Sequence, residues 1–346
     1  MTIANFDFNS DKTFIIAELS ANHNGSLDTA IESIRAIAKT GADAVKLQTY
    51  TADTLTLNCD NRYFTIDGGT LWDGKTLYEL YQEAYTPWEW HEELFSIAEE
   101  VGLICFSSPF DSTAVDFLEQ FDPPAYKIAS FEITDIPLIE YTASKGKPVI
   151  ISTGIATLEN IEEALEACRR QGNNNIILLK CTSAYPAPLE EANLKTIADM
   201  VTKFQTVVGF SDHTLDMVAP VAAVALGARV IEKHFILDRN IGGPDAAFSL
   251  DVNAFSQMVQ AVRDTEKLLG SVDYTISEKI EQSRQFARSL FVAQDIKKGE
   301  RITTTNVRSV RPGYGAHPKY LQDMLGKRAK KNLHFGMPLN LGDVVF

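Results

Sequence analysis

Residues Gly209–Phe235 read GFSDHTLDMVAPVAAVALGARVIEKHF, and this stretch decides the fold. It begins at the end of a short apolar strand, Thr206–Phe210, and runs through a polar turn and an Ala/Val-rich helix into a second strand, Val230–His234. His213 and His234 therefore each lie at the C-terminal end of a strand in one β-α-β unit. In an α/β barrel, neighbouring strand ends meet at the rim where active sites are built. Two imidazoles converging there predict a divalent metal site, with two unrelated rim histidines as the alternative.

The same rhythm of apolar strand and amphipathic helix runs through the preceding chain. Near-continuous apolar strands are typical of a parallel sheet that is buried on both faces. We expect six further strands, at Phe14–Ala17, Ala44–Gln48, Leu103–Ser107, Ala125–Ala129, Pro148–Ser152 and Ile176–Cys181. We expect the other helices at Leu27–Lys39, Trp88–Glu100, Ser112–Gln120, Pro137–Ser144, Leu158–Arg170, Glu190–Lys203 and Val252–Leu269. Eight strands, each followed by a helix, predict a (β/α)8 TIM barrel.

Two segments depart from this rhythm. The insertion Tyr50–Thr86 carries several aromatic residues, which favours a lid or a substrate wall over disorder. After residue 270 the pattern becomes polar and then β-rich with Gly and Pro turns. We therefore predict a catalytic barrel at 1–270, a linker at 271–285 and a small β-rich domain at 286–346, docked on the barrel or on a partner subunit.

Composition limits the function classes. The net charge of -14 argues against nucleic acid and anionic membranes as partners. The four cysteines lack the spacing of a metal site or a disulfide framework, which favours a reducing cytoplasm. No signal peptide or membrane-spanning run is recognisable, so we expect a soluble cytoplasmic protein.

The ends of the predicted strands are polar throughout, which predicts a catalytic rim. Because side chains alternate along a strand, Lys46 and Lys127 are better candidates for the interior than Lys233. Lysines in such a place need anionic partners, and nearby hydroxyls favour a phosphate or carboxylate substrate. The alternative is that the lysines pair with barrel carboxylates such as Glu18 or Glu132.

Several other polar residues have either a structural or a functional role. Asp111 is expected to cap the helix that follows it. His23 is either a ligand or a loop residue bonded to the backbone. Asp245 follows Gly242-Gly243-Pro244 and either points into the barrel mouth or only forms the turn. Arg311, in the small domain, is a candidate to enter a cleft.

The residues resemble those of the sialic acid synthase family, the phosphoenolpyruvate-dependent synthases of nonulosonic acids. The resemblance spans almost the whole barrel in order. It is carried by IAELSANHNG (Ile16–Gly25), GADAVKLQTY (Gly41–Tyr50), SSPFD (Ser107–Asp111), YKIASFEITDIPL (Tyr126–Leu138), GKPVIISTGIATL (Gly146–Leu158), CTSAYPAP (Cys181–Pro188), GFSDHT, GARVIEKHF and GGPDAAFSL (Gly242–Leu250). The tail is similar to that family's antifreeze-like (SAF) domain, with RPG at Arg311–Gly313. The resemblance implies a domain-swapped homodimer in which this domain covers the partner's active site.

The resemblance also implies roles for individual residues. The metal, usually manganese with magnesium or cobalt as options, would lie on His213 and His234. The phosphate of phosphoenolpyruvate would lie near Lys127, Ser130, Ser152 and Ser211, and its carboxylate near Lys46. The sugar or the reacting centre would face Glu18, Gln48, Glu132, Tyr185 and Asp245, with Arg311 reaching across from the other subunit. Ser183 stands where sialic acid synthases often carry Asn, which leaves its contact open.

Within the family, GGTLWDGKTLYELYQEAYTPWEW (Gly68–Trp90) looks like pseudaminic acid synthases in particular. Where N-acetylneuraminate synthases usually carry His after Gly-Pro-Asp, this chain has Ala246-Ala247-Phe248, a wall that suits a 6-deoxy sugar. The implied reaction joins phosphoenolpyruvate to 2,4-diacetamido-2,4,6-trideoxy-L-altrose, with Glu18 and Glu132 as candidates for stabilising a cationic C2 or deprotonating water. The alternatives are an N-acetylneuraminate or legionaminate synthase acting on another N-acetylated amino sugar, a barrel aldolase, or a non-catalytic carbohydrate-binding protein.

Overall fold

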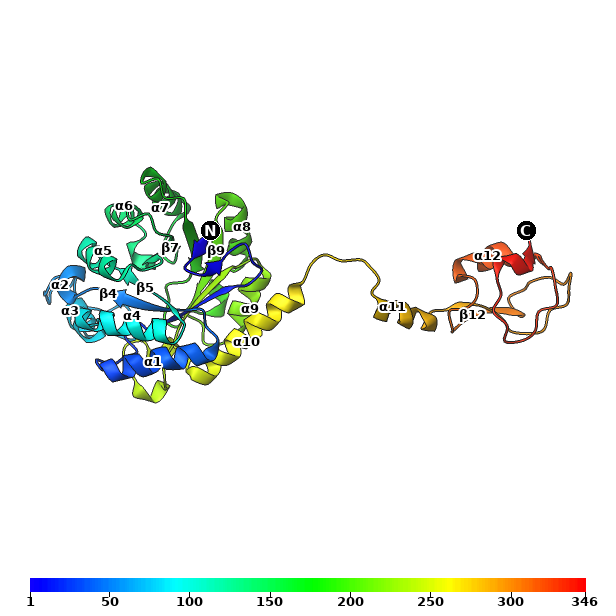
Figure 1. Ribbon diagram of the computed structural model, residues 1–346, viewed down its shortest axis with the longest axis horizontal. Helices are drawn as coiled ribbons and strands as arrows, with labels where there is room; N and C mark the ends of the chain where they lie inside the picture. The colour runs from blue at the N-terminus through cyan, green and yellow to red at the C-terminus, as the bar shows by residue number, and fades with distance from the viewer. The chain divides into compact units, whose positions relative to one another are not determined.

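The computed structural model describes residues 1–346, which form two compact units at residues 1–270 and 271–346. In the first unit, helices α1 to α10 surround a central set of strands (Figure 1). The second unit contains α11, α12 and the last four strands. Each unit has its own apolar core.

The strands of the first unit form a closed barrel in the order β10-β3-β4-β5-β6-β7-β8-β9, and every neighbouring pair is parallel. The predicted (β/α)8 barrel is therefore confirmed. The strands are β3 (Phe14–Glu18), β4 (Ala44–Thr49), β5 (Ile104–Pro109), β6 (Tyr126–Ile128), β7 (Val149–Ser152), β8 (Ile176–Cys181), β9 (Val207–Asp212) and β10 (Val230–His234).

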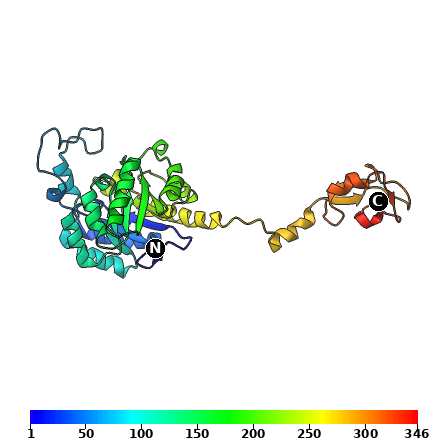
Figure 2. The ribbon, with the colours of Figure 1, turned by 90° about the horizontal axis from the view of Figure 1, so that it is seen from above.

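Eight helices cover the outside of the barrel (Figure 2). In the first of them, Ser26 accepts a hydrogen bond from the Thr29 amide at the start, and Gly41 ends the helix at a φ of 85°. No helix in the molecule combines the length and the apolar composition needed to cross a bilayer. The covering helices are α1 (Leu27–Thr40), α4 (His91–Glu100), α5 (Ser112–Leu118), α6 (Ile136–Ala143), α7 (Leu158–Arg170), α8 (Lys195–Phe204), α9 (Val218–Ala225) and α10 (Val252–Leu269).

The barrel interior is apolar at one end and polar at the other, because alternate residues of each strand point inward. Ile16, Ala44, Phe106, Ile150 and Val230 belong to one buried apolar cluster inside the barrel. Two or more residues further along the same strands, the inward positions become charged or hydroxylated. The sequence thus places an apolar cluster at the amino ends of the strands and a polar cavity at their carboxyl ends.

One glycine is required by this packing. A Cβ on Gly209 would lie 2.5 Å from Val230 Cβ and 2.7 Å from Leu179 Cδ2. Any larger residue there would force the two neighbouring strands apart. The glycine therefore allows strand β9 to lie close to β8 and β10 directly below the polar end.

The predictions miss two details of this unit. The N-terminal segment is more than a polar leader: β1 (Thr2–Ile3) and β2 (Phe6–Asp7) form an antiparallel hairpin. Phe6 packs against Phe14 with ring centroids 4.7 Å apart, so the hairpin belongs to the apolar cluster inside the barrel. The sixth helix begins at Lys195 and not at Glu190, because Asn193 adopts a left-handed φ of 45° that interrupts the helical path.

The insertion after β4 contains two short helices, α2 (Ala52–Leu55) and α3 (Leu77–Ala84). Each starts with a threonine capping box, at Thr51 and Thr76. The segment between them extends from the barrel as a loop (Figure 2). This insertion is therefore ordered by local hydrogen bonds, as its composition predicts.

The second unit begins with an exposed segment that contains α11 (Glu278–Ser283). Its folded part has β11 (Ser289–Val292) paired with β12 (Val307–Val310), and β13 (Arg328–Ala329) paired with β14 (Val344–Val345). A short helix, α12 (Leu321–Met324), precedes β13. Its core includes Leu290, Ile302 and Leu339, each completely buried. The small β-rich domain is therefore present with a core of its own.

Candidate active site

A cavity opens at the carboxyl ends of the barrel strands, and twelve of the fourteen predicted site residues line it. Of the other two, Ser183 lies beside the cavity, close to the backbone of Gly154, and Arg311 is exposed in the second unit. The twelve are Glu18, Lys46, Gln48, Lys127, Ser130, Glu132, Ser152, Tyr185, Ser211, His213, His234 and Asp245.

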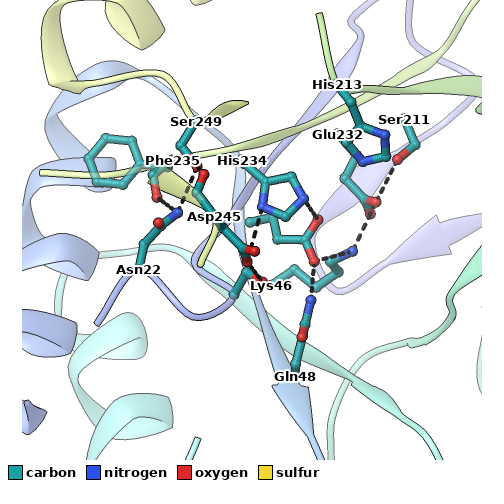
Figure 3. Close-up of polar contacts among 12 residues, drawn as sticks. Asn22, Lys46, Gln48, Ser211, His213, Glu232, His234, Phe235, Asp245 and Ser249 are labelled. Carbon is teal, nitrogen blue, oxygen red and sulfur yellow. Dashed lines mark hydrogen bonds and ion pairs between the residues drawn. The ribbon is translucent and has the colours of Figure 1, made fainter. Parts of the chain in front are cut away.

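Two lysines, Lys46 and Lys127, and two carboxylates, Glu18 and Glu232, form the charged floor of this cavity. Figure 3 shows Lys46 and Glu232 of this set. Lys46 Nζ lies 3.0 Å from Glu18 Oε1 and 2.9 Å from Glu232 Oε1. Lys127 Nζ lies 3.2 Å from the same oxygen of Glu232. The lysines therefore do pair with barrel carboxylates, as the alternative interpretation proposed. They nevertheless line an open cavity, so an anionic substrate can reach them.

The charges of this cluster stabilise one another. Burial opposes ionisation of Glu18, but His234, Lys46 and Lys127 hold its pKa well below the ordinary value. Burial likewise opposes ionisation of Glu232, and Lys127 and Lys46 lower its pKa. Burial lowers the pKa of Lys127, whereas the carboxylates outweigh burial at Lys46 and raise its pKa. Both carboxylates are thus anions that hold cations at the cavity floor.

Glu232 is the functional residue that the sequence predictions missed. It accepts a hydrogen bond from Ser211 Oγ at 3.0 Å and lies two residues before His234 on β10. The signal was available, because residues two apart on a strand share a face. Lys233 faces the other way, where it forms a fully buried pair with Asp212. The preference for Lys46 and Lys127 over Lys233 is therefore confirmed.

The two histidines lie side by side, with ring centroids 5.4 Å apart. His213 Nδ1 lies 2.9 Å from the carbonyl oxygen of Thr182, which makes this nitrogen the donor, so in the neutral ring Nε2 carries the lone pair that can bind a metal. His234 Nε2 is 3.2 Å from Glu18 Oε2, and its Nδ1 is buried without a hydrogen-bond partner.

This donor set fits a divalent ion. No group of three or more His, Cys, Asp or Glu side chains is arranged to hold a metal by itself. Two imidazoles with carboxylates at their edges match an open site whose remaining positions take water or substrate. The buried, unpartnered Nδ1 of His234 is the kind of atom that a ligand or an ion would satisfy.

Glu132 differs from the other carboxylates. Its Oε2 is buried without a partner, and burial raises its pKa to about 7 despite the nearby Lys127. Ser152 Oγ is also buried and unpartnered, while Ser130 Oγ accepts a hydrogen bond from the Gly154 amide at 3.1 Å. The cavity thus offers a carboxyl group that titrates near neutrality and hydroxyls that can bind an anion.

Asp245 is held in place by a loop-to-loop network rather than by its turn alone (Figure 3). Asn22 donates hydrogen bonds to the Phe235 carbonyl and to Ser249 Oγ, both at 2.8 Å. Ser20 donates a short hydrogen bond to Asp245. Because Asp245 lines the cavity beside His234, it points into the mouth.

Two other ambiguous residues have structural roles. Asp111 accepts hydrogen bonds from the amides of Thr113 and Ala114 and caps α5, as predicted. His23 is completely buried and does not line the cavity. Its Nδ1 accepts from the Gly25 amide at 3.1 Å, and its Nε2 lies 3.2 Å from Thr86 Oγ1. The backbone-bonded interpretation of His23 is therefore the correct one.

The apolar side of the cavity comes largely from the insertion. Tyr50, Leu55, Trp72, Leu80, Tyr81 and Ala84 all line it, together with Tyr185 and Phe248. The insertion predicted as a lid or substrate wall therefore forms one wall of the site.

Comparisons with known proteins agree with this geometry. The NeuB family profile matches residues 33–274 and the SAF domain profile matches residues 287–345. The chain is 53% identical to the pseudaminic acid synthase of Campylobacter jejuni, over 97% of this chain and 98% of the relative. It is 50% identical to the pseudaminic acid synthase of Helicobacter pylori, over 95% and 97%.

Solved structures show the same architecture. The crystal structure of the spore coat polysaccharide biosynthesis protein spsE from Bacillus subtilis matches 100% of this chain and 99% of that chain, with a TM-score of 0.67 and 35% identity. The match covers both units of this chain, so the fold is shared along its whole length. The chain belongs to the NeuB family, with a SAF domain at its C-terminal end.

Proposed function

We propose that the protein is a pseudaminic acid synthase. It condenses phosphoenolpyruvate with 2,4-diacetamido-2,4,6-trideoxy-L-altrose and releases pseudaminic acid and phosphate. The observation that carries the proposal is the meeting of Lys46 and Lys127 with His213 and His234 in one cavity. The full-length similarity to two pseudaminic acid synthases supports the choice of sugar.

Phosphoenolpyruvate has a phosphate and a carboxylate, and the cavity floor has a cation for each. Lys127, with the hydroxyls of Ser130, Ser152 and Ser211, would hold the phosphate. Lys46 would hold the carboxylate. Since Glu18 and Glu232 already fix both ammonium groups, the lysines are positioned before the substrate arrives.

His213 and His234 would hold a divalent ion, manganese first and magnesium or cobalt as alternatives. Such an ion supplies a Lewis acid that polarises the aldehyde of the open-chain sugar. The hydrogen bond from His213 Nδ1 to Thr182 orients that ring toward the cavity. Glu18 and Asp245 lie at the edges of His234 and would orient the second ring.

The bond changes follow from this arrangement. C3 of phosphoenolpyruvate attacks the sugar aldehyde carbon, forming the new carbon–carbon bond while the aldehyde oxygen takes up a proton. C2 of phosphoenolpyruvate becomes cationic, and a water molecule adds there and loses a proton. The C2–O bond to phosphate then breaks, C2 becomes a ketone and inorganic phosphate leaves.

The two candidate carboxylates divide these tasks between them. Glu18 is held as an anion by its cationic neighbours, so it suits stabilisation of the positive charge at C2. Glu132, whose pKa is raised by burial to about 7, suits removal of the proton from water. Their opposite pKa shifts support this assignment of the two roles, which the sequence leaves open.

The assembly belongs to the same proposal. We infer a cytoplasmic homodimer in which Arg311 of one subunit serves the active site of the other. The motif resemblance supports the exchange, and the free state of all four cysteines suits a reducing compartment.

A panel of N-acetylated sugars tests the function. Each sugar is incubated with the protein, phosphoenolpyruvate and Mn2+, and the products are identified by mass spectrometry with phosphate release measured in parallel. We expect pseudaminic acid from the 2,4-diacetamido-6-deoxy sugar. A preference for N-acetylmannosamine would instead identify an N-acetylneuraminate synthase, and phosphoenolpyruvate consumption without a new carbon–carbon bond would reject the synthase reaction.

A further inference from the structure

Trp72 bridges the insertion that follows β4 and the loop that follows β10, two strands separated in the barrel only by β3. Its indole Nε1–H donates a hydrogen bond to the Pro244 carbonyl at 3.1 Å, across 172 positions of sequence. Pro244 directly precedes Asp245, and all three residues line the cavity. Trp72 is therefore part of the cavity wall even though its neighbours Leu71 and Asp73 are exposed.

Three aromatic rings meet at this point. Trp72 lies 5.9 Å from Tyr185 and 6.5 Å from Phe248, and Tyr185 and Phe248 are 5.0 Å apart, measured between ring centroids. The same wall reaches the histidines, since Phe248 lies 4.9 Å from His234 and Tyr185 lies 4.4 Å from His213. The triad Trp72–Tyr185–Phe248 thus extends from the histidines outward to the insertion.

This wall faces the part of the sugar that does not react. In the proposed reaction the aldehyde lies at the histidines, while the floor is occupied by lysines and carboxylates that hold phosphoenolpyruvate. The rest of the open chain must therefore run outward, along side chains supplied by the insertion. Besides Trp72 these are the apolar groups of Leu55, Leu80 and Ala84 and the ring of Tyr81.

Of the three rings, Tyr185 alone carries a hydroxyl group. The rings of Trp72 and Phe248 have little capacity to bind a sugar hydroxyl, because the single donor of Trp72 is already used by Pro244 and Phe248 has none. A hydroxyl pressed against these rings would lose water without gaining a partner, whereas a methyl group would gain contact area. The wall therefore discriminates by chemistry as well as by shape.

We propose that Trp72 is a specificity-determining residue that selects a methyl group over a hydroxymethyl group at C6 of the sugar. This inference rests on the proposed function, because it assigns a part of that substrate to a part of that site. An apolar wall of this kind discriminates by about 10- to 100-fold. Substitutions at Trp72 should change that ratio more than they change the chemistry at the histidines.

The test compares two sugars that differ by one hydroxyl group, 2,4-diacetamido-2,4,6-trideoxy-L-altrose and its 6-hydroxy counterpart. The ratio of their kcat/KM values is measured for wild type, Trp72→Ala, Trp72→Phe and Tyr63→Ala. Trp72→Phe keeps an aromatic ring and loses the N–H. It therefore separates the effect of the apolar ring from that of the hydrogen bond to Pro244. Tyr63→Ala is the matched control, since Tyr63 is an exposed aromatic residue of the same insertion and does not line the cavity.

We expect Trp72→Ala to lower the preference for the 6-deoxy sugar by about tenfold, mainly by raising its KM. Trp72→Phe should retain most of the preference, and Tyr63→Ala all of it. If wild type turns over the 6-deoxy sugar and Trp72→Ala has the same ratio of kcat/KM values as wild type, this inference is wrong while the proposed function stands. No product from either sugar with wild type overturns the proposed function and the inference together. If Trp72→Ala fails to fold, Trp72→His replaces it: a ratio below that of wild type supports the role of Trp72, and a ratio equal to that of wild type rejects it.

Discussion

Lys46 and Glu232 form a buried ion pair in the barrel, with 2.9 Å between Lys46 Nζ and Glu232 Oε1. The same oxygen also lies 3.2 Å from Lys127 Nζ, so one carboxylate contacts both cations of the cavity floor. All three side chains are at most 2% exposed. Because a buried charge without a partner is costly, Glu232 is what allows two lysines to face a substrate cavity.

Replacing Glu232 by Gln should therefore destabilise the fold. The substitution keeps the shape and leaves two lysines undercompensated, and breaking such a pair costs about 3–5 kcal/mol. Urea unfolding measures the loss. Glu281→Gln is the control, since Glu281 forms an exposed pair with Arg284 and should change stability by about 1 kcal/mol or less. Equal midpoints for wild type and Glu232→Gln would show that the lysines do not depend on Glu232.

The same cluster predicts a pH dependence of stability. The pKa values of Glu18 and Glu232 are lowered in the folded state, so between those values and the ordinary 4.5 the unfolded chain binds more protons. Their stabilising contribution is complete above pH 4.5 and is lost as the pH falls through the folded pKa values. Unfolding free energies measured from pH 7 downward should decline below pH 4.5, and Glu232→Gln should show a shallower decline.

Glu132 predicts a different pH dependence, in activity. Because its pKa is raised to about 7, the carboxylate needed as a base forms as the pH rises through that value. The rate should rise through pH 7, and Glu132→Gln should remove this limb and lower kcat by about 10²- to 10⁴-fold. Folding is affected in the opposite sense: the folded state holds the proton between pH 4.5 and about 7, so this group weakens stability as the pH rises through that window.

Exposed Glu92 on α4 gives a control for the Glu132 experiment. Glu92→Gln should leave both the rate and its pH profile unchanged. A Glu132→Gln enzyme that keeps the wild-type profile would assign the ascending limb to another group.

The histidine pair predicts a metal requirement. His213→Ala and His234→Ala should each lower activity by at least about 10²-fold and reduce Mn2+ binding, because each removes one imidazole donor. Isothermal titration calorimetry of chelator-treated protein with Mn2+ measures the binding affinity independently of catalytic turnover. His317→Ala, an exposed histidine of the second unit, should bind Mn2+ as wild type does. Full activity of His213→Ala in metal-depleted buffer would reject the assignment.

The exchanged assembly can be tested by complementation. Arg311→Ala and His213→Ala should each be inactive alone. The first substitution damages the C-terminal unit, and the second damages the barrel. Mixing after mild dissociation should restore about one quarter of wild-type activity, since about half of the dimers would be mixed and each would hold one complete site. If Arg311 served its own barrel, mixed dimers would gain nothing and the mixture would stay inactive.

The sequence predicted most of the site because barrel strands have a strict geometry. Once the strand ends are located, inward residues such as Lys46 and Ser152 follow from alternation. The same rule applied to His234 would have found Glu232, which was overlooked because Lys233 and His234 are the more conspicuous residues. His23 could not be assigned in advance, since its partners Gly25 and Thr86 become visible only once the loop and the insertion are folded.

The sequence by itself determined the eight-strand barrel, the position of the rim, the histidine pair and the separate C-terminal domain. These depend on local periodicity and on alternation along single strands, which are properties of neighbouring residues. Only the tertiary structure decided which carboxylate serves which lysine, why the pKa values of Glu18 and Glu132 shift in opposite directions, and that Trp72 joins the cavity through Pro244. Those features depend on burial and on contacts between segments far apart in the sequence, 172 positions in the case of Trp72 and Pro244, and no local pattern encodes them.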